Sequence, residues 1–160
     1  MTTMLRAGLV LLAAVEWVLG LWTAFLPRSF YEDVPTVDLT PPFSEHLMRD
    51  VGGATLGLAI ALTAAAIWLE RRLVVVALLA YLAFALPHLV FHVAHLEHAT
   101  PLEATVLVAL QAGAVVLPLA LLAITRRAGL PRAPGSPPAS GSPGPASPAA
   151  GRRTSSPSPR

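Results

Sequence analysis

Residues 73–96 read LVVVALLAYLAFALPHLVFHVAHL, and this stretch decides the class of fold. It contains no acidic residue, lysine or arginine over its whole length. An α-helix needs about 20 mostly apolar residues to cross a bilayer, because the hydrocarbon core is about 30 Å thick. The stretch is long enough and apolar enough to predict a membrane-spanning helix, which contains Pro87.

Three further blocks of the same kind are present, and we expect them to span at residues 4–26, 44–69 and 102–125. Of the 160 residues, 54% are hydrophobic and only 12% are charged, whereas a soluble domain carries roughly 25% charged residues. The apolar residues also form long blocks, without the helical or strand spacing of a soluble core. The sequence therefore predicts an all-α integral membrane protein, with a four-helix bundle in residues 1–128.

The segments outside the predicted spans have a different composition. Residues 27–43 are rich in proline, acidic and aromatic residues, and we expect an irregular loop because proline interrupts a regular helix. Ser44 is the expected N-cap of the second span. Residues 129–160 are mostly proline, serine, glycine, alanine and arginine, with little apolar surface to bury. That composition predicts a disordered C-terminal tail.

The arginine positions predict the orientation of the spans. Basic residues are enriched in cytoplasmic loops. Arginines precede the first span, occupy the turn between the second and third spans, and follow the fourth span. The acidic 27–43 loop lies at the other end of the spans. We therefore expect a multi-pass protein of the cell membrane with both termini cytoplasmic. The arginines concerned are Arg6, Arg71, Arg72, Arg126, Arg127 and Arg132.

Composition also excludes several classes of function. The chain has no cysteine, which excludes disulfides, zinc–thiolate sites and iron–sulfur clusters. No basic stripe interleaves with aromatic residues, so we expect no nucleic-acid partner. The partner that the composition does imply is membrane lipid.

Several ionisable side chains fall inside the predicted spans. Each costs about 2.5–3.5 kcal/mol at the centre of a spanning helix, even on the insertion scales that give low penalties. Such residues are therefore candidates for function. They are Glu16 in the first span, His46, Arg49 and Asp50 in the second, and His88, His92 and His95 in the third.

The spacing of these candidates predicts how they group. The three histidines of the third span are four and three residues apart, so they project from one stripe of the helix. His46 and Asp50 share a second stripe with Gly53 and Gly57, and glycine lets helices approach closely. At 1.5 Å per residue, Asp50 and His92 both lie about 10–12 Å outward of the midplane, and His46 and His95 lie somewhat farther out. We therefore expect both stripes to face the bundle interior and to form one cluster.

A transition-metal site is one interpretation of this cluster. Imidazole and carboxylate groups suit zinc, iron, copper or manganese, and helix bundles build metal sites from inward-facing residues. His46, Asp50 and the three histidines are then the metal ligands, and Glu16 and Arg49 are the candidate catalytic groups. Haem held by two histidines is a less favoured cofactor, because no pair is fixed at haem-spanning distance. The same residues also suit a structural hydrogen-bond network that only holds the helices together.

The stretch from Phe30 to Glu103 resembles a group of short, uncharacterised actinobacterial membrane proteins. The resemblance covers about half of the chain and most of the membrane region. It implies a four-helix membrane fold and no particular activity. In helix count and size, the chain is also similar to DoxX-type membrane proteins, a likeness that concerns the fold alone. The residues that carry the first resemblance are Phe30-Tyr31, Glu45-His46-Leu47-x-Arg49-Asp50-Val51-Gly52 and Pro87-His88-x3-His92-x2-His95-Leu96.

Three functions are compatible with these patterns. The first is a metal-binding membrane protein, such as a lipid or quinone oxidoreductase, with a hydrophobic small molecule as its substrate. The second is a non-catalytic accessory or scaffold subunit, which would form a homo-oligomer or bind a membrane-protein partner. The third is a proton-coupled transporter, because histidine and acidic residues inside membranes also form proton relays. Whether the chain is an enzyme stays open at this point.

Overall fold

The computed structural model describes residues 1–39 and 42–131, and these residues form helices joined by short connections. Each of the four long helices is long and apolar enough to cross a membrane. The prediction of an all-α membrane bundle is confirmed. The predicted disordered tail lies, from residue 132 onward, outside the described residues. The long helices are α1 (Thr2–Phe25), α3 (Glu45–Trp68), α4 (Arg71–Ala94) and α5 (Pro101–Arg127).

The connection between α1 and α3 contains more helix than the sequence predicts. It holds a short helix, α2 (Pro27–Asp33), and a single 3-10 turn, η1 (Val37–Leu39). Pro27 occupies the first position of α2. The missing N–H of proline costs nothing there, because the first amides of a helix have no partner within it. The expectation of an irregular loop is therefore wrong for residues 27–33, where proline begins a helix and does not interrupt one.

Side-chain caps fix where two of the spanning helices begin. The Ser44 hydroxyl accepts a hydrogen bond of 3.4 Å from the Leu47 amide, as predicted for an N-cap. At the start of α5, the Thr100 hydroxyl accepts from the Glu103 amide at 3.3 Å. The Glu103 carboxylate accepts in return from the Thr100 amide at 2.8 Å. This reciprocal capping box uses the Glu103 carboxylate to begin the helix.

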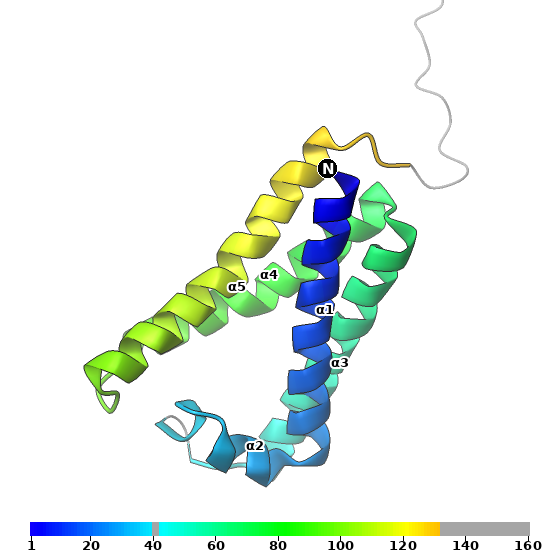
Figure 1. The fold of residues 1–160 in the computed structure, drawn as a ribbon. Coiled ribbons are helices and arrows are strands. Elements are labelled where there is room, and N and C mark those ends of the chain that lie inside the picture. The colour runs from blue at the N-terminus through cyan, green and yellow to red at the C-terminus, as the bar shows by residue number, and fades with distance from the viewer. Residues whose placement is uncertain (40–41, 132–160) are drawn as a thin grey trace, which may run out of the picture.

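The four long helices form two antiparallel pairs, and the pairs diverge (Figure 1). Helix α1 lies along α3, and α4 lies along α5. The pairs meet at the end that contains the N-terminus, the α3–α4 turn and the end of α5. Towards the other end, where α2 lies, they separate. The arginines near these three segments, at positions 6, 71, 72, 126 and 127, therefore gather at one end of the bundle.

The apolar core lies where the two helix pairs meet. Leu5 and Leu9 of α1, Leu62 of α3, and Val74 and Leu78 of α4 are fully buried in one cluster. Lipid tails are as apolar as leucine, so helices in a membrane associate mainly through close packing. The core therefore lies towards the N-terminal end of the bundle.

Glycine allows α1 and α3 to lie close together, and the glycine concerned is Gly52. A Cβ atom at Gly52 would lie 2.5 Å from the main-chain nitrogen of Ala24. By contrast, a Cβ atom at Gly53 or Gly57 would meet nothing within 4 Å. The predicted packing stripe through Gly53 and Gly57 is therefore wrong. The contact lies one residue earlier, which is about 100° around the helix.

Candidate functional site

The inner face of α4 changes from apolar to polar along its length. Its buried residues Val74, Leu78, Tyr81 and Ala85 follow one another at alternating steps of four and three residues. This spacing keeps side chains on one stripe of a helix. The first part of the stripe packs in the closed core, and the last part lies where the helix pairs have separated. Continued by the same steps, the stripe reaches His88 and His92, and His95 follows as the C-cap residue just after the end of α4.

The three histidines form an aromatic ladder along α4. The His88 and His92 rings lie 4.5 Å apart, edge to face. Phe84 stacks on His88 with ring centres 5.3 Å apart, and Phe91 stacks on His95 at 4.2 Å. His88 and His92 are half-buried, while His95 is exposed. Every ring contact that the described structure gives these histidines is with another residue of α4.

His95 has one ring nitrogen engaged with the main chain. Its Nδ1 lies 2.8 Å from the carbonyl oxygen of Phe91. A carbonyl oxygen can only accept, so Nδ1 carries the proton of this contact in a neutral ring. The other nitrogen, Nε2, is then free to accept a hydrogen bond or to bind a ligand.

Glu16 and Gln111 place two more polar groups on the inner faces of the bundle. Glu16 is only 3% exposed and lies on the buried stripe of α1 with Leu9 and Leu12. Its Oε2 atom is buried and has no hydrogen-bond partner among the described residues. Leu9 and Leu12 share the core cluster with Tyr81 of α4, so this stripe of α1 faces the opposite helix pair. Gln111 is half-buried and lies four residues after the buried Leu107 of α5.

His46 and Asp50 lie on the other side of α3 from its buried face. They pair with each other at 3.2 Å between Nε2 and Oδ2, and their side chains are 89% and 61% exposed. The buried face of α3 passes through Gly52, Thr55 and Ala59. At 100° per residue, His46 and Asp50 point roughly opposite to that face.

The structure does not bring the two predicted stripes together. The beginning of α3, with His46, and the end of α4, with His95, are separated in Figure 1 because the helix pairs diverge. Within the described ranges, no group of three or more histidine, aspartate or glutamate side chains could hold a metal ion. The His88 and His92 rings are in contact, whereas the His95 ring stacks on Phe91.

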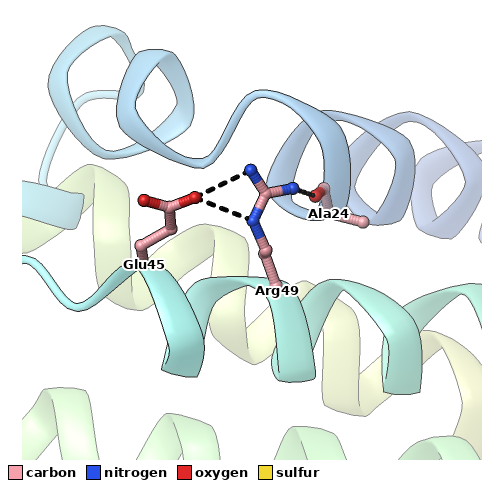
Figure 2. A network of polar contacts seen from close by, with 3 residues as sticks. All are labelled: Ala24, Glu45 and Arg49. Atoms are coloured by element: carbon pink, nitrogen blue, oxygen red, sulfur yellow. Dashed lines mark hydrogen bonds and ion pairs between the residues drawn. The ribbon is translucent and has the colours of Figure 1, made fainter.

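Arg49 joins α1 to α3 (Figure 2). Its Nη1 donates a hydrogen bond of 2.7 Å to the Ala24 carbonyl oxygen. Its Nε and Nη2 donate to Oε1 of Glu45 at 3.0 and 2.8 Å. Carbonyl groups in the last turn of a helix lack intrahelical partners and carry the negative end of the helix dipole. The contacts of Arg49 are therefore those of a residue that stabilises the helix pair.

Sequence reasoning missed two interactions that hold the other half of the same helix pair. Arg6 donates from Nε to the Ala66 carbonyl oxygen at 3.1 Å, and the Trp17 indole donates to the Thr63 hydroxyl at 3.0 Å. The position of Arg6 in the sequence could have indicated the first interaction. Arg6 lies at the start of the first span, and a long basic side chain there can reach the last carbonyl groups of an antiparallel neighbour. Comparisons with known protein families, with characterised proteins and with solved structures find no match to this chain.

Proposed function

We propose that this chain binds a quinone-like molecule of the bilayer between its two helix pairs. The polar head lies against the histidine stripe of α4, and the apolar tail extends into the hydrocarbon. One observation carries the proposal. The stripe that packs Val74 and Leu78 in the core continues as three histidines where the helix pairs diverge.

Imidazoles at the end of α4, where the helix pairs diverge, need a polar partner. An ionisable side chain that faces hydrocarbon costs about 2.5–3.5 kcal/mol near the middle of a span, and less towards the end of the span. The described protein gives His88 and His92 ring contacts only, whereas a quinone carbonyl can accept a hydrogen bond from an imidazole N–H. The adjoining Phe84 and Phe91 rings offer faces on which a planar head can stack.

Glu16 suits a supporting role on the opposite helix pair. Its buried Oε2 has no partner in the described protein. An unpaired buried polar atom is unfavourable, so a second polar atom of the ligand, or water that accompanies it, would relieve that cost. Gln111 lies on the inner face of α5, four residues after the buried Leu107, and its amide has both donor and acceptor groups.

A transition metal on the same stripe is a second candidate, favoured by the His95 contact. Histidines that ligate metals usually donate their other ring N–H to a carbonyl or carboxylate group, as His95 does to Phe91. Zinc, iron, copper or manganese would suit such imidazoles. Iron or copper would add the redox capacity that a quinone oxidoreductase requires.

Thermal unfolding of the full chain in detergent, with and without decylubiquinone or a naphthoquinone of equal chain length, tests the proposal. A ligand that binds only the folded state raises the melting temperature, and the rise grows with the ratio of ligand concentration to Kd. We expect the rise in the parent protein and in His98→Leu, the control, because His98 is exposed and lies beyond α4. We expect no rise in His92→Leu. An equal rise in both variants would contradict the proposal.

A further inference from the structure

A groove runs between α1 and α3. Its volume is about 550 Å3, and small side chains, Ala13, Ala14 and Ala66, contribute to its lining. Val10 and Ile67 also border it and are 52% and 61% exposed. Both helices are long and apolar enough to span the membrane. The groove therefore opens towards the hydrocarbon that surrounds the protein.

Arg6 lies at one end of this groove with part of its guanidinium unused. Its Nε donates to the Ala66 carbonyl oxygen at 3.1 Å, which fixes the side chain across the helix pair. Its Nη1 and Nη2 make no hydrogen bond or ion pair with the described residues. Guanidinium groups bind phosphate through paired N–H donors. Arg6 also lies at the arginine-rich end of the bundle, where an anionic head group is attracted.

Trp17 and Thr63 lie at the other end of the groove. The Trp17 indole donates to the Thr63 hydroxyl at 3.0 Å, and that hydroxyl donates to the Ala59 carbonyl oxygen at 2.7 Å. The polar atoms at this end are therefore satisfied within the protein, and they present no unpaired group to a ligand. This end of the groove suits an apolar chain.

The length of the groove matches one leaflet. Arg6 and Trp17 are 17 − 6 = 11 positions apart in α1. At 1.5 Å per residue, this is about 16 Å along the helix. Half of a hydrocarbon core that is about 30 Å thick is about 15 Å. A lipid whose phosphate lies at Arg6 would therefore extend its acyl chain to the level of Trp17.

We propose that the α1–α3 groove binds one anionic phospholipid of the leaflet at the N-terminal end. Its phosphate pairs with the Nη groups of Arg6, and one acyl chain lies along the alanines of the groove. All lining residues of the groove belong to α1 and α3, so this site is separate from the histidines proposed to bind the quinone.

Native mass spectrometry of the full chain in detergent can measure this binding. The probes are phosphatidylglycerol and phosphatidylcholine with identical acyl chains. We expect the parent protein to bind phosphatidylglycerol more tightly. Arg6→Gln removes a charge-assisted interaction, so we expect about tenfold weaker binding of phosphatidylglycerol and little change for phosphatidylcholine. Arg72→Gln is the matched control, because Arg72 is exposed at the same end and is not in the groove.

A second pair of variants tests the acyl-chain part of the site without changing a charge. Ala14→Phe places a ring in the groove, and we expect it to weaken the binding of both lipids. Ala83→Phe is the control, since Ala83 is exposed on α4. Equal binding of both lipids by the parent, or equal losses in Arg6→Gln and Arg72→Gln, would overturn the proposal. Displacement of the lipid by glycerol phosphate at equal concentration would also overturn it, because the acyl chain would then contribute nothing.

Discussion

Arg49 of α3 donates a hydrogen bond of 2.7 Å from Nη1 to the main-chain oxygen of Ala24, in the last turn of α1. The other end of the pair repeats this relationship, because Arg6 of α1 donates to the Ala66 carbonyl oxygen near the end of α3. Each helix thus places an arginine at the negative end of its partner's dipole. The antiparallel α1–α3 pair is held at both ends by charged hydrogen bonds.

Arg49→Gln should lower the stability of the helix pair. The variant loses the bond to Ala24 and the pair with Glu45, and we expect a loss of about 1 kcal/mol because the side chain is half-exposed. Arg28→Gln is a matched control, since Arg28 pairs with Glu32 at 3.0 Å within α2 and lies over the Phe43 ring of the α2–α3 connection, and neither contact joins α1 to α3. Thermal unfolding in detergent measures both. Equal melting temperatures for the two variants would contradict the role of Arg49 between helices.

Gly52→Ala and Gly53→Ala should differ sharply although the two residues are adjacent. The new methyl group at Gly52 would lie 2.5 Å from the Ala24 nitrogen, so α1 and α3 must move apart. We expect a loss of about 1–3 kcal/mol, as for other overpacked sites. At Gly53 the methyl group meets nothing, and the higher helix propensity of alanine should stabilise the protein by up to about 1 kcal/mol. Unfolding curves in which Gly53→Ala is the less stable variant would refute this packing.

Reporter fusions test the topology. The structure places the N-terminus and the end of α5 at one end of the bundle, and α2 at the other. A reporter after residue 130 should therefore be cytoplasmic, and a reporter in the α2–α3 connection at residue 36 should be outside. The same side for both reporters would rule out four membrane crossings.

If the protein binds a transition metal, the binding should depend on the histidines of α4 and not on His46 of α3. His46 faces away from the buried side of α3, so His46→Ala should retain the metal content of the parent. His92→Ala should lose it, because the His92 ring is the one in contact with the His88 ring. Elemental analysis of the purified proteins measures this content. Loss of metal in His46→Ala would support the cluster across two helices that the sequence predicts.

The sequence predicts the fold well because bilayer thickness sets the length of a spanning helix. The histidine stripe can also be predicted from the sequence, because the spacing from His88 to His95 follows helical geometry. The predicted packing stripe of α3, through Gly53 and Gly57, is wrong for a physical reason. Gly52 and Gly53 are chemically identical, and choosing the wrong one rotates the face by about 100°. How far the two helix pairs diverge depends on side-chain packing. Two residues can therefore lie at the same depth in the membrane and still be far apart within it.

Photolabelling with an azido-quinone tests the central claim most directly. The full chain in detergent is irradiated with the probe, digested, and mapped by mass spectrometry, with an unlabelled quinone as competitor. We expect labelling between Phe84 and His95 that the unlabelled quinone suppresses, and we expect its loss in His92→Leu but not in His98→Leu. Competable labelling confined to the exposed side of α3 around His46, with none on α4, would contradict it.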